Sequence, residues 1–244
     1  MANDFQMIPV NDAKEAQWMA ESMEKPWSRS KNANYVAAVI PRGFAAYARV
    51  FHPAYFRNED REISWSEVAK HMGRTPHSQM QWHSIATFNN SDTHFNDMLN
   101  GLIEPYSGHL PERQAKALID ILSQYTSTPE NCYLAIWDGW NATPLEKLRD
   151  QTACFQLWNR NYYLVKGDIA AAVNCISSFS PAAPGIWWPE DRTWCVATEV
   201  DMMWTYVGGT ECCIDKILMD ARLEALRAAP DDRADIYGDE INVG

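Results

Sequence analysis

Carboxylates stand beside tryptophans at several places in the second half of the chain. Residues 137–140 (WDGW) place a carboxylate between two indoles directly after an apolar run, and residues 187–192 (WWPEDR) place charged residues after two more indoles. A carboxylate beside an aromatic wall in a cleft can have a raised pKa and act as an acid or a base. The same combination can also bind a cationic ligand or anchor a protein partner.

Two further carboxylates follow in the apolar run that starts at Trp194. Glu199 and Asp201 occupy alternate positions, as Trp204 and Tyr206 do in the next run, so each pair shares one face if these runs are strands. Three interpretations stay open for these stretches: an aromatic edge of the core with satisfied carboxylates, a binding surface, or a catalytic site. The candidate site residues are Trp137, Asp138, Trp140, Trp187, Trp188, Asp191, Arg192, Glu199, Asp201, Trp204 and Tyr206.

Motifs for cofactors and metals are missing from the sequence. It holds no Walker loop, no Rossmann glycine fingerprint, no HExxH, no EF-hand loop and no GxSxG elbow. His71, His77 and His83 recur every six residues, which matches neither one face of a helix nor a metal-binding hairpin. The six cysteines form no CxxC pair and are expected to be reduced, buried thiols. The sequence therefore predicts no cofactor and no metal site.

Charge and composition restrict the partners. The chain has 244 residues and a net charge of −11, so it repels nucleic-acid phosphates and anionic lipid and would attract a basic partner. No run reaches the ~20 apolar residues of a membrane span, and the first ten residues do not resemble a signal peptide, so we expect a cytoplasmic protein. The 11 tryptophans either fill the core or line a groove. The oligomeric state is left open.

The elements that must position these residues follow from caps, breakers and periodicity. The predicted helices cover residues 11–23, 64–72, 111–128, 168–176 and 211–227. The predicted strands cover residues 35–40, 44–51, 132–137, 154–158, 162–165, 194–200 and 203–207. Residues 79–87 fit a strand or a helix, and residues 181–189 are expected to form a rigid loop that carries the WWPEDR stretch. Ser64 and Glu67 form a predicted capping box.

Hairpin signals outnumber crossover signals, which predicts an α+β fold with a mainly antiparallel sheet and flanking helices. We expect an N-terminal helix and loop over residues 1–34, a single globular domain over 35–230 and a loosely ordered acidic tail over 231–244. Residues 89–111 are the one candidate seam within the domain.

The motifs also carry a resemblance to a widespread family of bacterial proteins, numerous in actinobacteria, for which no activity is established. Residues 41–53 (PRGFAAYARVFHP) resemble its N-terminal signature, and residues 128–129 with 137–140 resemble its middle block. Its C-terminal block resembles residues 187–192 (WWPEDR), 194–199 (WCVATE) and 204–209 (WTYVGG). The resemblance covers about residues 40–226 and implies a bacterial, cytosolic protein of a single unit, without implying any catalytic role.

Two hypotheses of function follow. The first is a protein-binding module, because an acidic, aromatic-rich chain without catalytic motifs resembles in general character the immunity proteins that neutralise toxins, which bind basic partners through carboxylates and aromatics. The second is a hydrolase-like enzyme in which Asp138, Glu199 and Asp201 supply paired carboxylates in a tryptophan-lined cleft. A flat acidic surface with exposed tryptophans would favour the first hypothesis, and a deep pocket with two carboxylates would favour the second.

Overall fold

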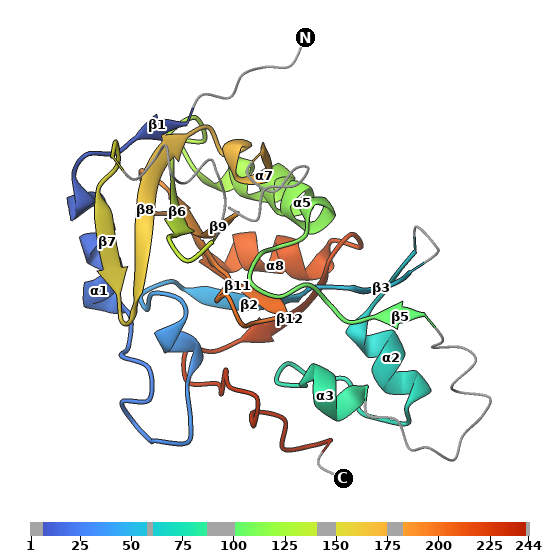
Figure 1. Cartoon of the computed structure of the whole chain (residues 1–244). Helices are drawn as coiled ribbons and strands as arrows, with labels where there is room; N and C mark the ends of the chain where they lie inside the picture. Colours follow the sequence, from blue (N-terminus) through green and yellow to red (C-terminus); the bar gives the residue numbers. More distant parts are fainter. Residues whose placement is uncertain (1–6, 58–60, 87–100, 141–149, 175–182, 243–244) are drawn as a thin grey trace.

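An antiparallel sheet runs through the middle of the structure, and helices cover both of its faces (Figure 1). The structure is a computed structural model that describes residues 7–57, 61–86, 101–140, 150–174 and 183–242. Every strand pairing in this part of the chain is antiparallel. The predicted α+β class with a mainly antiparallel sheet is therefore confirmed.

Nine of the described strands form the main sheet. Their order is β1 (Ile8–Pro9), β8 (Arg160–Gly167), β6 (Cys132–Trp137), β9 (Pro184–Pro189), β10 (Cys195–Ala197), β11 (Trp204–Gly209), β2 (Ala46–Phe51) and β12 (Glu224–Ala228), with β7 (Cys154–Leu157) also paired to β8. Three shorter strands form a second sheet: β4 (Glu62–Ile63), β3 (Ala54–Phe56) and β5 (Leu102–Ile103).

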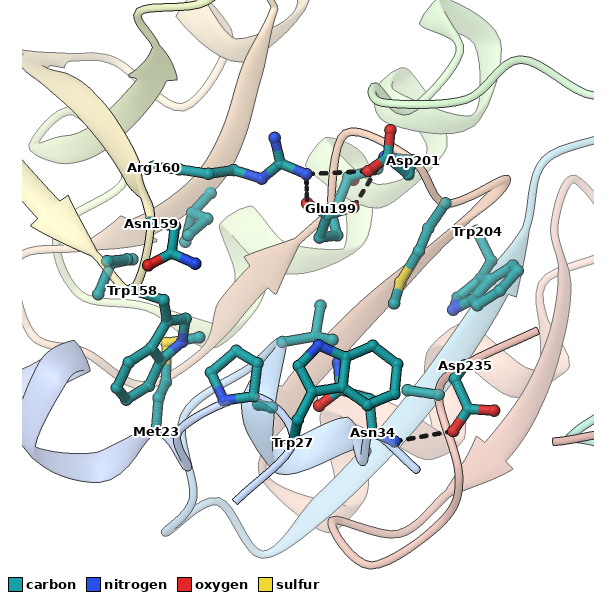
Figure 2. A pocket seen from close by; sticks show the side chains of 18 of the residues that line it. Met23, Trp27, Asn34, Trp158, Asn159, Arg160, Glu199, Asp201, Trp204 and Asp235 are labelled. Atoms are coloured by element: carbon teal, nitrogen blue, oxygen red, sulfur yellow. Dashed lines mark hydrogen bonds and ion pairs between the residues drawn. The ribbon is translucent and has the colours of Figure 1, made fainter. Parts of the chain in front are cut away.

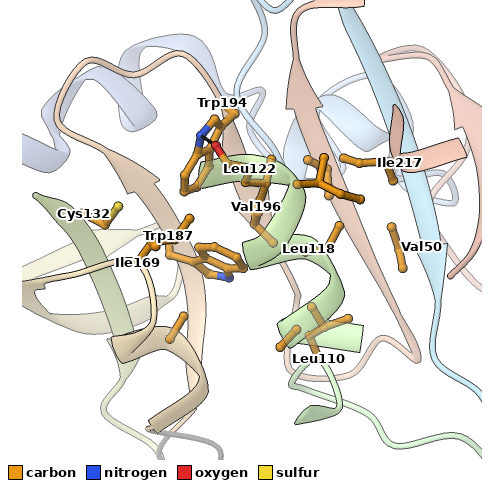
Figure 3. Packing of buried hydrophobic residues seen from close by; sticks show 14 of the residues in the cluster. Val50, Leu110, Leu118, Leu122, Cys132, Ile169, Trp187, Trp194, Val196 and Ile217 are labelled. Carbon is orange, nitrogen blue, oxygen red and sulfur yellow. Dashed lines mark hydrogen bonds between the residues drawn. The ribbon is translucent and has the colours of Figure 1, made fainter. Parts of the chain in front are cut away.

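Alternate side chains of each central strand enter two separate cores. On one face, Val50, Trp187 and Val196 pack under α5 (Glu112–Leu122), α7 (Ala171–Asn174) and α8 (Glu211–Met219), as Figure 3 shows for the buried cluster around Leu118. The other face packs against η1 (Ala13–Ala16), α1 (Gln17–Ser22), η2 (Val36–Ala38), α2 (Trp65–His71) and α3 (Trp82–Ile85). A short helix, η3 (Ser123–Tyr125), extends α5. Among the described residues, no helix is both long and apolar enough to cross a membrane.

Local signals placed several elements correctly. Ser64 and Glu67 form the predicted capping box: the Ser64 side chain accepts from the Glu67 N–H, and the Glu67 carboxylate accepts from the Ser64 N–H. Strand β6 and the β7–β8 hairpin also lie where the sequence predicted them. The amphipathic helix α5 begins as predicted but ends at Leu122, earlier than the predicted residue 128. Residues 79–87, which fitted a strand or a helix, contain the single turn of α3, and residues 87–100 lie outside the described part.

The predicted strand over residues 35–40 is wrong, and so is the hairpin that it was expected to form around Pro41. These residues contain the short helix η2, in which the hydrogen bonds are local: the Val39 N–H donates to the Val36 carbonyl oxygen. The Val36 and Ala37 N–H groups donate to carbonyls of Asp232 and Pro230 in the C-terminal segment. The run is apolar at every position, so it had no period that could separate strand from helix.

Two other predictions fail because pairing in the sheet overrides local preference. The helix predicted over residues 211–227 ends at Met219, and β12 then pairs with β2 although its residues include good helix formers. Within the loop expected over residues 181–189, Pro184–Pro189 form the central strand β9, between β6 and β10, and residues 181–182 lie outside the described part. The two prolines of β9 lie at the ends of the strand, where the missing N–H groups cost least.

The C-terminal segment, residues 231–242, packs against the rest of the structure, whereas a loosely ordered tail was expected from its acidity. Asp239 is 3% exposed, and its carboxylate accepts from the N–H groups of Gln81 and Asn242 and from the Asn242 side-chain amide. The His77 ring lies 2.8 Å from the same carboxylate. These bonds attach the segment to the loop before α3.

Replacing Asp239 tests this attachment. We expect Asp239→Ala to lower the free energy of unfolding by about 3 kcal/mol, because it leaves several buried donors without an acceptor. The neighbouring Glu240 has a side chain that is 80% exposed, so Glu240→Ala should cost about 0.5 kcal/mol or less. Urea unfolding of both variants measures the difference. Equal losses in the two variants would show that the segment is not held by Asp239.

Candidate functional site

A cavity of about 610 Å³ opens where several neighbouring strands of the main sheet, among them β8, β10 and β11, begin or end. Its walls come from the turns that follow β7 and β10, from the segments on either side of η2, and from the chain that follows β12. Five aromatic side chains line it: Trp27, Trp158, Tyr162, Trp204 and Tyr237. Figure 2 shows the indoles of Trp27, Trp158 and Trp204 arranged around one space. The cavity therefore joins segments that are far apart in the sequence.

Two of the tryptophans stand on left-handed backbone. Trp27 has φ 61° in the turn after α1, and Trp158 has φ 57° in the two-residue turn between β7 and β8. Among non-glycine residues of the described part, Arg192 is the third with positive φ. Such a conformation costs about 1–2 kcal/mol for a residue with a side chain. Strain of this kind is concentrated at functional sites in proteins, so its occurrence twice in one cavity wall favours a role for the cavity.

An arginine joins two of the predicted carboxylates at the rim. The Arg160 Nη2 atom lies 2.5 Å from Glu199 Oε1 and 2.9 Å from Asp201 Oδ2, and both acids stand on the turn between β10 and β11 rather than on a strand. Arg160 also lies over the Trp137 ring, with its Cζ 5.2 Å from the ring centroid. One guanidinium thus holds both carboxylates in place (Figure 2).

The opposite wall is built by the C-terminal segment. The Asn34 N–H donates to Asp235 Oδ2 at 2.8 Å, and Arg233 donates to both oxygens of the same carboxylate. Three polar atoms of the lining are buried and have no hydrogen-bond partner in the described part of the chain: Asn34 Oδ1 and the indole Nε1 atoms of Trp158 and Trp204. A buried polar group without a partner costs about 1–3 kcal/mol, so a ligand that satisfies one of these groups gains that energy if the side chain turns toward it.

Tyr162 forms part of the floor and keeps its proton. Burial raises the pKa of its hydroxyl, and the negative charge of Glu199 raises it further. At neutral pH this tyrosine is therefore a neutral hydrogen-bonding group and carries no charge into the cavity.

The predicted site residues divide into three groups in space. Glu199, Asp201 and Trp204 line the cavity. Trp137 is connected to it through Arg160 and packs edge-on against Trp140, with ring centroids 5.4 Å apart. Asp138 directly follows β6, and its carboxylate accepts from the side-chain amide of Asn161 in β8 at 3.3 Å.

The other predicted residues lie away from the cavity. Trp187 belongs to the core under α5, whereas Trp188 and Tyr206 are buried in the opposite core. The Asp191 carboxylate accepts from the hydroxyls of Thr126, Ser127 and Thr193 and from the N–H groups of Ser127 and Thr193. Burial raises its pKa, but these bonds together hold it below the usual range. The Arg192 guanidinium lies over the Trp18 ring, with its Cζ 5.4 Å from the centroid. These contacts are structural.

Sequence reasoning missed half of the cavity wall. Trp27 and Asn34 belong to the predicted N-terminal segment and Asp235 to the predicted tail, and the sequence places neither segment next to the aromatic residues of the domain. Trp158 was predicted as the last residue of a strand, whereas it stands in the two-residue turn between β7 and β8 and packs partly buried against the core on that face.

Behind the cavity, a buried chain of hydrogen bonds braces the turn that carries Glu199. His52 Nδ1 lies 2.6 Å from the Tyr106 carbonyl oxygen, which can only accept, so Nδ1 carries the proton. His52 Nε2 then accepts from the Thr205 hydroxyl at 2.9 Å, and Thr205 in turn accepts from the Thr198 hydroxyl at 2.7 Å. Burial lowers the pKa of His52 to about 3.

This histidine should make stability depend on pH. Its pKa is lower in the folded state than in the unfolded state, so the unfolded chain binds the extra proton, and stability falls as pH drops below about 6.5. We expect the wild type to lose about 2 kcal/mol more than His52→Gln between pH 7 and pH 5, measured by urea unfolding at both pH values. Parallel losses in the two proteins would contradict a neutral buried His52.

Comparison with known proteins found no matching family model, no matching curated protein and no matching solved structure. The role of the cavity is therefore argued from its geometry.

Proposed function

We propose that the chain is a binding protein whose cavity takes the flat, apolar part of a ligand. The observation that carries this proposal is the set of five aromatic side chains around one space of about 610 Å³. Ligand pockets typically measure about 300–1,000 Å³ and combine apolar walls with a few polar groups. Here the polar groups are the Arg160 ion pairs on one side and the Asn34–Asp235 pair on the other. The two strained tryptophans support the same conclusion.

Hydrolysis by paired carboxylates has less support. A glycoside hydrolase places its two carboxyl groups on opposite sides of the bond that it cleaves. Glu199 and Asp201 instead meet on one side of the cavity, at the same guanidinium nitrogen of Arg160. Asp138, the third candidate, does not line the cavity. The carboxylates thus fit the role of holding Arg160 better than that of acid and nucleophile.

A protein partner is a second candidate, because the mouth of the cavity carries exposed apolar side chains. Trp27 is 49%, Ile236 is 56% and Tyr237 is 66% exposed. Aromatic residues around a pocket are typical of interface hot spots, and the net charge of −11 would attract a basic partner, as in an immunity protein that neutralises a toxin. A stoichiometric basic protein recovered with the tagged chain from its host would favour this candidate.

Replacing Trp27 tests the small-ligand proposal. A panel of indole and naphthalene derivatives, screened by calorimetry, should contain compounds that bind the wild type and bind Trp27→Ala roughly 5- to 10-fold more weakly, because one stacking wall is lost. Met219 is 81% exposed and lies outside the lining, so Met219→Ala is the matched control and should bind as the wild type does. A panel without binders, or with equal affinity for Trp27→Ala, would contradict the proposal.

A further inference from the structure

A second, smaller cleft lies where β2 ends and β12 begins, and acidic groups line it. It has a volume of about 410 Å³ and is bounded by the start of α2, by α5 and by the turn before β12. Glu62, Glu67 and Glu224 supply three carboxylates, against one guanidinium from Arg222. A second guanidinium, that of the exposed Arg113, lies outside the lining with its Nη1 3.6 Å from Glu62 Oε2. Arg222 is already bound to Asp220 and Asp120, which stand outside the lining. The cleft therefore keeps an excess of negative charge.

The serine hydroxyls of the cleft are bonded to its carboxylates. The Ser64 hydroxyl donates to Glu67 at 2.6 Å, and the Ser66 hydroxyl is hydrogen-bonded to Glu224. The Glu224 carboxylate also accepts from the N–H groups of Trp65 and Ser66, at 2.6 and 2.7 Å. It makes no ion pair within the described part of the chain. Burial raises the pKa of Glu224, as expected for a carboxyl group that lacks a cation partner.

Gln114 is the independent sign of a ligand. It is 3% exposed and lines the cleft, and its Nε2 donates to Glu62 Oε2 at 3.0 Å. Because a carboxylate only accepts, this bond fixes the orientation of the amide. Among the residues that the structure describes, Gln114 Oε1 consequently has no donor, which costs about 1–3 kcal/mol for a buried acceptor unless a ligand supplies one.

We propose that this cleft binds an alkylguanidinium group. A guanidinium has five N–H donors in one plane, which suits a site that offers acceptors and excess negative charge. Gln114 Oε1 and the outer oxygens of Glu62 and Glu67 supply the acceptors, and Pro53 and Leu223 supply an apolar wall for the alkyl chain. The same chemistry occurs in a free guanidinium compound and in an arginine side chain of a protein partner.

Calorimetry with matched probes tests the proposal. The probes are butylguanidinium, the peptide acetyl-Ala-Arg-Ala-amide and the same peptide with neutral citrulline in place of arginine. We expect both guanidinium probes to bind and the citrulline peptide to bind at least tenfold more weakly. A tighter arginine peptide would indicate a protein partner, and a tighter butylguanidinium would indicate a small molecule. Equal affinity for citrulline and arginine would overturn the proposal.

Variants then locate the site. Gln114→Met keeps the size of the side chain and removes the unpartnered acceptor, so it should weaken butylguanidinium binding at least fivefold without lowering thermal stability. Glu62→Gln should weaken binding at least tenfold. Glu240→Gln removes the same charge from an exposed position outside the cleft and should change affinity less than twofold. An unchanged affinity in both cleft variants, or an equal loss in Glu240→Gln, would overturn the proposal.

Discussion

The structure depends on covering both faces of the main sheet. Every residue of β2, β9 and β11 is buried, so side chains on either face enter one of two cores. The helices α5 and α8 cover one face, and α1, η2 and α2 cover the other. At about 25 cal/mol per Å² of apolar surface, this burial is the main favourable term in folding, and it leaves no open face for a ligand. Any site must then lie at strand ends or edges.

Even a charged residue of the central strands, Arg49, is buried by this covering. It stands in the middle of β2, is 1% exposed, and donates one hydrogen bond to the Ser78 carbonyl oxygen. Its Nε and Nη2 have no hydrogen-bond partner among the described residues. Burial lowers the pKa of its guanidinium to about 10, which still leaves it charged at neutral pH. Its Cζ lies 3.9 Å from the Trp204 ring centroid, so one face of this indole is already used by a cation. Trp204 thus connects the core to the cavity wall.

The covered sheet also explains which elements the sequence could predict. Helix α5 and the capped start of α2 carry their own signals, namely a 3.6-residue period and a capping box. A strand buried on both faces loses the alternation that identifies a strand, so β9 was mistaken for a loop. Strand β12 depends on its pairing with β2, which a local pattern cannot report.

The site was predictable to the extent that it is local in sequence. Glu199, Asp201 and Trp204 lie within six residues, and the structure places all three at the cavity. Their partners come from distant segments: Trp27 precedes the domain's first long strand, and Asp235 follows its last. Trp187 and Trp188 have the same local composition as the site residues but enter the cores, because β9 lies between two other strands.

The 11 tryptophans make the central claim directly measurable, because each indole N–H gives its own signal in a ¹H–¹⁵N spectrum. The measurement is a titration of the labelled protein with a binder from the aromatic panel, with the indole signals assigned by substitution. Ligand binding in the cavity predicts large shifts for Trp27 and Trp158, with Trp187 and Trp194 unchanged in the core on the other face of the sheet. Shifts confined to indoles outside the cavity, or spread evenly over all of them, would contradict the account.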